Sequence, residues 1–125
     1  MLKLFKKISI LLVILIFTSI AYSKRTAPKP VEPIIYKGIK YEAIHWGKSR
    51  GLGQNGGYIE AFSAKTGKSL WVLKVYSIKY GKFAGDAYDN FIRSMKVDNG
   101  YLIIDNERGG KYKVNLSTKE VSKVN

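Results

Sequence analysis

The 125-residue chain has no cysteine, one histidine, three prolines and only 9 acidic residues. Without cysteine it can form no disulfide, and no lipid can be attached to a thiol. The three prolines all lie within residues 24–33, so none interrupts the remainder of the chain. A domain without disulfides must be held together by its hydrophobic core, and the chain after residue 33 is long enough for one modest core.

The N-terminus has the order of charge and hydropathy that is typical of a secretory signal peptide. Lys3, Lys6 and Lys7 precede an apolar run over residues 8–20, and the small residues Ala21 and Ser23 then stand at positions −3 and −1. This order predicts cleavage after Ser23 and export, to the periplasm or out of the cell. The alternative is an uncleaved membrane anchor, but the run is shorter than the roughly 20 apolar residues that span a bilayer.

Acidic residues are few, whereas 22 residues are lysine or arginine, which gives a formal net charge of +13. Such a charge attracts polyanions. Export argues against nucleic acid, so the expected partner is a protein or an anionic polymer or membrane surface of the cell envelope. The basic residues are scattered among the strand-like segments, which is also typical of a surface that simply keeps a protein soluble.

Residues 24–33 are rich in proline and lysine and read as an extended tether. Residues 34–125 read as a single β-domain, because no window shows an apolar stripe with a period of 3.6 residues. We expect an all-β antiparallel meander of about six to eight strands. The strand-like segments are residues 34–46, 57–63, 69–80, 90–97, 101–106, 111–116 and 119–124.

Tight turns separate these segments. Asn99 and Gly100 form the strongest hairpin signal, because both residues accept the positive φ that a two-residue turn requires. Gly109-Gly110 and Ser117-Thr118 mark the next two turns, and Lys37-Gly38 would divide the first segment.

The letters TGKS at residues 66–69 resemble the end of a phosphate-binding loop, but the rest of that motif is absent. The position six before Lys68 is Phe62 where the motif requires glycine, and a strand-like segment follows where the motif requires a helix. We interpret Gly67 as the left-handed residue of a hairpin turn. The glycine-rich residues 51–56 have dinucleotide-loop spacing and are likewise followed by a strand.

The segment AFSAKTGKSLW, residues 61–71, resembles the repeat of quinoprotein-type (PQQ-like) β-propellers. The resemblance implies that Thr66 and Gly67 make the turn between the last two strands of a blade. It also implies that Trp71 packs against a neighbouring blade. Ser63 stands where the family has aspartate, so the side-chain bond that braces the turn is expected to be weaker.

At an offset of 52 residues, KYKVNLSTKEV (residues 111–121) would be a degenerate version of the same unit, without the tryptophan; the sequence alone does not decide whether it is a true internal repeat. The offset aligns Gly57 with Gly109, Ser63 with Asn115 and Thr66 with Thr118, and it places Lys119 at the position of Gly67. At most two blade-like units fit in the domain, so a closed propeller is excluded by length. The resemblance therefore implies hairpin geometry and no quinone cofactor.

Candidates for chemistry are few. His45 is the one histidine and would act as a base only if an acid and a nucleophile converged on it, so we expect a packing or surface role and no catalytic residue. Asp86, Tyr88 and Asp89 are the candidates for binding, on the loop at residues 81–90. This loop has too few oxygen ligands and no calcium-loop pattern, so we expect no metal, and we interpret its aspartates as turn-forming.

The sequence therefore predicts a small exported binding or structural module of the bacterial envelope or the extracellular space. One alternative is a secreted inhibitor that inserts the loop at residues 81–90 into a partner enzyme. The other is a small exported hydrolase, for which the sequence shows no catalytic constellation.

Overall fold

The computed structural model describes residues 27–80 and 88–124. The predicted signal peptide, its cleavage site after Ser23 and the start of the predicted tether lie outside these residues. The helix in the described ranges is the 3-10 helix η1 (Lys48–Arg50), and none there is long and apolar enough to cross a membrane.

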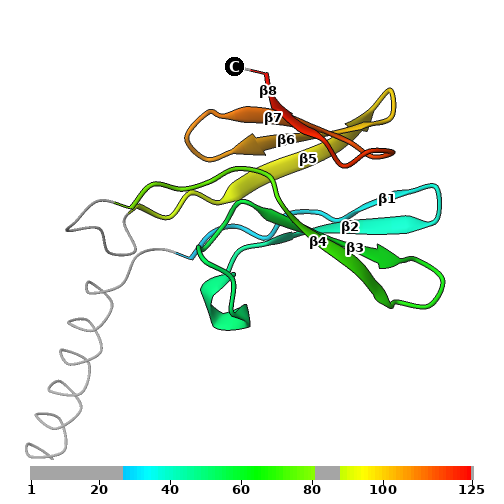
Figure 1. The fold of residues 1–125 in the computed structure, drawn as a ribbon, viewed down its shortest axis with the longest axis horizontal. Helices are drawn as coiled ribbons and strands as arrows, with labels where there is room; N and C mark the ends of the chain where they lie inside the picture. Colours follow the sequence, from blue (N-terminus) through cyan, green and yellow to red (C-terminus); the bar gives the residue numbers. More distant parts are fainter. Residues whose placement is uncertain (1–26, 81–87, 125) are drawn as a thin grey trace, which may run out of the picture.

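The described residues form two four-stranded antiparallel sheets, each with its strands in sequence order. This architecture confirms the all-β prediction, and the two sheets lie one above the other (Figure 1). The first sheet contains β1 (Ile34–Tyr36), β2 (Ile39–Ile44), β3 (Tyr58–Ser63) and β4 (Ser69–Lys74). The second contains β5 (Ile92–Asp98), β6 (Tyr101–Asn106), β7 (Lys111–Asn115) and β8 (Val121–Lys123).

The hydrophobic core lies between the two sheets and follows the period of two that strands impose on their side chains. In β6, Leu102 and Ile104 are fully buried, whereas Ile103 between them is only partly buried. In the first sheet, Tyr41 and Ile59 are buried against the same core. We call the side of each sheet that contacts this core its inner face and the opposite side its outer face.

Equivalent two-residue turns join the first two strands of each sheet. Lys37 and Gly38 have φ of 49° and 77°, and Asn99 and Gly100 have φ of 52° and 81°. Two consecutive positive φ values match the right-handed twist of the flanking strands. Local turn chemistry therefore fixes where each hairpin reverses.

The last two strands of each sheet are also joined by equivalent turns. In the first, the N–H of Gly67 donates to Ser63 O at 2.8 Å, and the N–H of Ser63 donates to Lys68 O at 2.9 Å. In the second, the N–H of Lys119 donates to Asn115 O at 2.7 Å, and that of Asn115 donates to Glu120 O at 2.8 Å. The same backbone bonds thus recur at the 52-residue offset.

At the opposite end of the sheets, residues 107–110 join β6 to β7 in a short turn, whereas the β2–β3 and β4–β5 connections are longer. β4 ends at Lys74, and residues 75–80 leave the sheet although the sequence predicts a strand as far as residue 80. Residues 27–33 form no strand, yet Val31 packs against the core. The described part of the predicted tether therefore lies on the domain.

Candidate functional site

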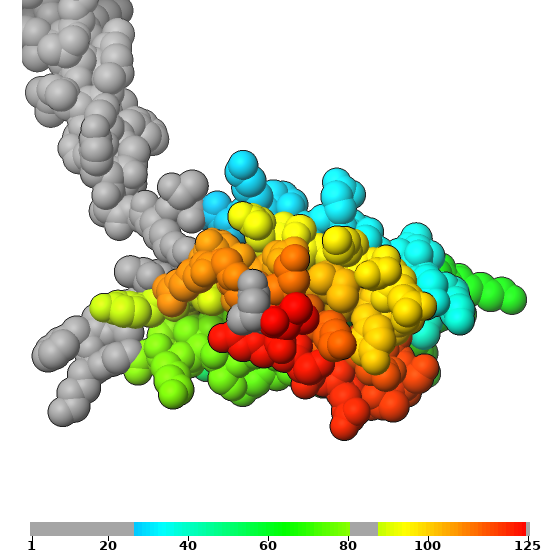
Figure 2. Space-filling view, turned by 90° about the horizontal axis from the view of Figure 1, so that it is seen from above, coloured from blue at the N-terminus to red at the C-terminus, as the bar shows by residue number. Residues whose placement is uncertain are grey.

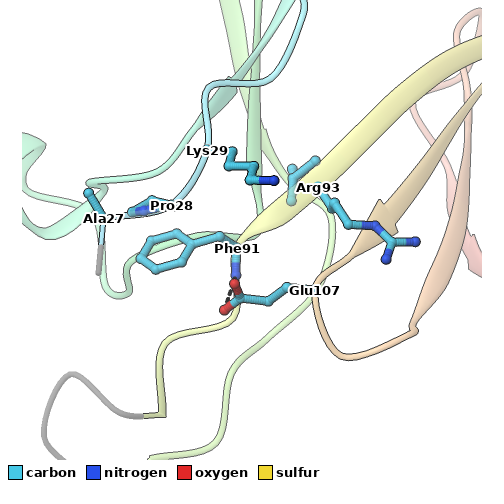
Figure 3. A pocket seen from close by; sticks show the side chains of 7 residues that line it. Ala27, Pro28, Lys29, Phe91, Arg93 and Glu107 are labelled. Atoms are coloured by element: carbon cyan, nitrogen blue, oxygen red, sulfur yellow. Dashed lines mark hydrogen bonds between the residues drawn. The ribbon is translucent and has the colours of Figure 1, made fainter. Parts of the chain in front are cut away.

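A pocket of about 510 Å³ opens at the end of the sheets where the irregular connections meet, which we call the loop end. Residues before β1, at the start of β5 and after β6 contribute to it, so it joins segments far apart in the sequence (Figure 3). Its lining residues are Ala27, Pro28, Lys29, Phe91, Ile92, Arg93 and Glu107.

Phe91 forms the apolar floor of the pocket. Its ring is buried and makes edge-to-face contacts with His45 and with Trp46, each with ring centroids 5.2 Å apart. Such aromatic pairs add directional packing to the burial of apolar area. Trp46 itself is 50% exposed, so it presents a large aromatic surface beside the pocket floor.

His45 attaches the N-terminal segment to the loop end. Its Nε2 lies 3.0 Å from Lys29 O, which can only accept a hydrogen bond, so Nε2 carries the proton in this arrangement. Its Nδ1 is buried and has no hydrogen-bond partner among the described residues. His45 therefore packs on Phe91 and holds the backbone of Lys29 at the pocket.

The rim of the pocket carries two exposed cationic side chains, those of Lys29 and Arg93. Glu107 is the acidic group of the lining, and its carboxylate accepts a hydrogen bond from the N–H of Phe91 at 3.3 Å (Figure 3). An apolar floor with charged groups at its rim suits a ligand that has an apolar body and an anionic group.

A buried polar network lies beneath the loop end and is centred on Asp89, which is 1% exposed. Its carboxylate accepts hydrogen bonds from the hydroxyl of Tyr80 at 2.6 Å and from Nδ2 of Asn55 at 3.3 Å. A buried carboxylate requires such donors, because burying it without them is costly. The network joins the β2–β3 loop to the segments on both sides of residues 81–87.

Gln54 makes a second set of bonds in the same region. Its Nε2 donates to Tyr76 O at 2.8 Å and to Gly56 O at 2.9 Å, and its Oε1 accepts from the N–H of Ile78 at 2.9 Å. The side chain of Gln54 therefore joins the β2–β3 loop to the irregular segment that follows β4. The neighbouring N–H groups of Gly53 and Asn55 also make internal hydrogen bonds, to the hydroxyls of Tyr58 and Tyr80.

Two tyrosines of this region act as fixed hydrogen-bond donors. Burial raises the pKa of Tyr76 far above its ordinary value, and its hydroxyl donates to Asn90 O at 2.6 Å. Burial and the hydrogen bond to Asp89 also raise the pKa of Tyr80. Both hydroxyls stay protonated at neutral pH, so the network keeps its donors.

A second candidate site lies on the outer face of the second sheet. Four lysines surround a shallow pocket of about 460 Å³ whose apolar lining includes Ile103 and Val124. We call this surface the lysine face; its lysines are Lys96, Lys111, Lys113 and Lys123. Lysine ammonium groups attract anions, although Lys111 lies 3.8 Å from the carboxylate of Asp105.

The candidates chosen from the sequence have different places in the structure. Asp86 lies outside the described residues, Tyr88 is exposed, and Asp89 is the buried centre of the polar network. The interpretation of Asp89 as a turn-forming residue is wrong, because its carboxylate bonds to Tyr80 and Asn55.

The turn residues chosen from the sequence lie away from the loop end. Thr66, Gly67, Asn99 and Gly100 lie in hairpin turns at the opposite end of the sheets. Trp71 is half-buried on the inner face of β4, with its ring centroid 5.9 Å from that of Tyr41.

Sequence reasoning missed Phe91 and Arg93 as parts of the pocket. Both occur within a strand-like segment, and the signal that marks Phe91 is its partnership with His45 and Trp46, which depends on tertiary packing. Within residues 27–80 and 88–124, no three acidic or histidine side chains come together in a way that could hold a metal ion. Comparison of the chain with models of protein families and with curated proteins found no match.

Proposed function

We propose that the protein is an exported, non-enzymatic binding module that holds an anionic polymer of the bacterial envelope at its loop-end pocket. The observation that carries this proposal is the pairing of Lys29 and Arg93 on the rim with the buried ring of Phe91 below them. Cationic groups supply attraction to the anionic groups of a polymer, and the exposed ring of Trp46 beside Phe91 supplies aromatic surface for its apolar parts.

The buried network supports this proposal, since a binding site needs its residues to be held in place. Asp89, Gln54 and Tyr76 tie the loops around the pocket to one another by hydrogen bonds. A pocket held in this way loses little conformational freedom on binding, which favours affinity. Cleavage after Ser23 would remove three lysines and no acidic residue, so the exported domain would keep a net charge of +10, which adds long-range attraction to any polyanion.

Equilibrium binding to a purified phosphate-rich cell-wall polymer tests the proposal. The double variant Lys29→Ala/Arg93→Ala removes both rim cations and should weaken binding by about a hundredfold, because each of the two charge-assisted contacts contributes about 1.5 kcal/mol. The matched control is Lys65→Ala/Lys68→Ala, which removes the same charge from the exposed β3–β4 turn. Equal weakening in both double variants would mean that net charge alone drives binding and would refute the site.

A further inference from the structure

The two sheets have the same strand order and equivalent turns, but they pack on the core through non-equivalent faces. The hairpin turns align Tyr41 of β2 with Ile103 of β6, because these residues lie three positions after Gly38 and Gly100. Tyr41 faces the core, whereas Ile103 lies on the outer face and lines the lysine pocket. Conversely, Glu42 lies on the outer face of the first sheet, and its equivalent Ile104 is fully buried.

The hairpins β3–β4 and β7–β8 show the same exchange of inner and outer faces. At the 52-residue offset, Ala61 of β3 aligns with Lys113 of β7, and Phe62 aligns with Val114. Ala61 and Val114 are fully buried, whereas Lys113 lines the pocket on the outer face. The second sheet is therefore stacked on the first as a repeat facing the same way, and the two sheets do not meet through equivalent faces as a symmetric sandwich would.

In this arrangement the outer faces of the two sheets are exposed, and they are not equivalent to each other. Each outer face is instead equivalent to the inner face of the other sheet, which packs in the core of the same chain. The outer face of the first sheet corresponds to the inner face of the second, and the outer face of the second corresponds to the inner face of the first. An interface between unlike faces is heterologous, so the same contact can be repeated between copies until it closes a ring or extends as a filament.

Apolar side chains are present on both open faces. On the first sheet, Ile35 of β1 is 68% exposed, and Leu70 and Val72 of the edge strand β4 are also exposed. On the second sheet, Ile103 and Val124 line the lysine face, which Figure 2 views from the side of β5 to β8. Exposed apolar surface of this kind, rimmed by charge, marks protein interaction sites.

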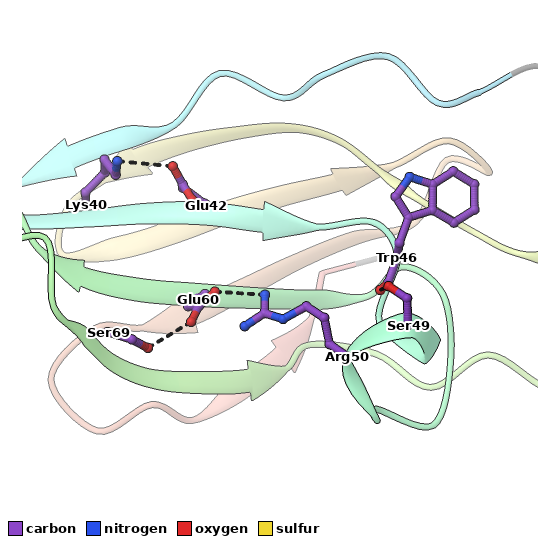
Figure 4. Close-up of polar contacts among 7 residues, drawn as sticks. All are labelled: Lys40, Glu42, Trp46, Ser49, Arg50, Glu60 and Ser69. Carbon is purple, nitrogen blue, oxygen red and sulfur yellow. Dashed lines mark hydrogen bonds and ion pairs between the residues drawn. The ribbon is translucent and has the colours of Figure 1, made fainter.

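The groups at the centres of the two open faces differ in sign, although each face also carries the other sign. Glu42 pairs with Lys40 at 3.2 Å, and the buried Glu60 pairs with Arg50 at 2.9 Å. Asp98 is among the lining residues of the lysine face. Glu42 and Glu60 lie directly opposite one another on β2 and β3, at the centre of the outer face of the first sheet (Figure 4). On the lysine face, Lys113 lies in the middle of β7, directly opposite Ile103 of β6.

Glu42 is equivalent to Ile104 of the second sheet, and Lys113 is equivalent to Ala61 of the first. Ile104 and Ala61 are both fully buried in the core between the two sheets. If copies stack as the two sheets do, Glu42 and Lys113 would therefore both lie within the contact between copies.

From these observations we infer that the protein associates with further copies of itself in a head-to-tail manner. The outer face of the first sheet of one copy packs on the lysine face of the next, and this contact repeats the stacking of the two sheets within the chain. Glu42 of one copy lies near Lys113 of its neighbour. The loop-end pocket is not part of this interface and stays open in the assembly.

A charge-swap experiment tests this inference by sedimentation velocity of the purified protein over a range of concentrations. Glu42→Lys and Lys113→Glu should each weaken association at least tenfold, because each brings like charges together. The double variant Glu42→Lys/Lys113→Glu should recover association, and so should an equimolar mixture of the two single variants. Lys65→Glu, in the exposed β3–β4 turn, is the control and should associate like the wild type.

Thermal melts of each variant monitor folding, so that a loss of association can be separated from unfolding. A wild-type protein that stays monomeric at every concentration would overturn the inference, and so would association that survives both single reversals. Release from an anionic polymer by Lys113→Glu, without any self-association of the wild type, would make the lysine face a polyanion site and would also overturn it.

Discussion

Gly67 and Lys119 occupy the same position in two equivalent turns, with φ of 75° and 65°. Each donates its N–H to the carbonyl of the residue four positions earlier. Glycine adopts the left-handed conformation without steric cost, whereas lysine does not. The second hairpin therefore keeps the geometry of the first although its sequence no longer favours it.

Replacing Gly67 should destabilise the first hairpin through backbone strain alone. No atom lies within 4 Å of the place where a Cβ would be added, so Gly67→Val should cost about 1–2 kcal/mol from the left-handed conformation. Lys68→Ala, on the exposed side of the same turn, should cost less than about 0.5 kcal/mol. Denaturant titration of both variants measures the difference, and equal stabilities would show that strain at Gly67 is unimportant.

Gly57→Ala should be more harmful than Gly67→Ala, although both positions have positive φ. A Cβ at Gly57 would lie 2.7 Å from Nε2 of Gln54 and 2.7 Å from Tyr76 O. The substitution therefore combines backbone strain with a clash in the buried network, and we expect a loss of about 3 kcal/mol or more against about 1 kcal/mol at Gly67. Urea unfolding of the two alanine variants checks the order, and the reverse order would contradict the role given to Gln54.

Trp71→Ala should remove packing between the two sheets. The ring contacts Tyr41, and Nζ of Lys119 from the other sheet lies 5.0 Å from its centroid. Truncating a fully buried tryptophan to alanine lowers the free energy of unfolding by about 3–5 kcal/mol. Because Trp71 is only half-buried, we expect a loss of about 2–3 kcal/mol. Thermal unfolding measures it, and a melting curve unchanged from the wild type would show that Trp71 makes no stabilising contact.

Glu60 should make stability fall in acid. Its carboxylate accepts hydrogen bonds from Arg50 at 2.9 Å and from Ser69 at 2.8 Å (Figure 4). The bond to Arg50 is the main cause that lowers the pKa of Glu60 below its ordinary value of 4.5. A lowered folded-state pKa gives stability that is present above the unfolded pKa and is lost as the pH falls through the folded one.

The Arg50→Ala variant isolates this contribution. Arg50 is partly exposed, so its removal should cost about 1 kcal/mol at neutral pH. The cost should shrink as the pH falls from 7 to about 3, because Glu60 becomes protonated in both proteins. Urea unfolding at several pH values provides the measurement. A cost that is constant over this range would mean that the ion pair does not link stability to pH.

The local features of the fold could be predicted from the sequence, but the arrangement of the sheets could not. Asn99-Gly100 and Gly67 mark their turns because tight turns depend on the residues within them. The division into two sheets depends on the chain leaving β4 at Lys74, where Tyr76 and Ile78 bond to neighbouring loops instead of another strand. Their partner, Gln54, is more than 20 residues away in the sequence, so no local sequence pattern predicts these contacts.

The candidate site was harder to predict for the same reason. The pocket combines Lys29 from the predicted tether with Phe91 and Arg93 from a strand-like segment, and His45 brings Lys29 into place. Asp89 could be named from its position in a polar loop, but its burial depends on Tyr80 and Asn55.

The most direct test of the central claim is to locate a bound polyanion on the protein by NMR. A short phosphate-rich cell-wall oligomer is titrated into isotope-labelled protein, and the shift of each backbone amide is followed. Our account predicts saturable shifts that cluster at Lys29, Phe91, Arg93 and Glu107, around the pocket. Shifts that cluster instead at the lysine face, or that never saturate, would contradict it.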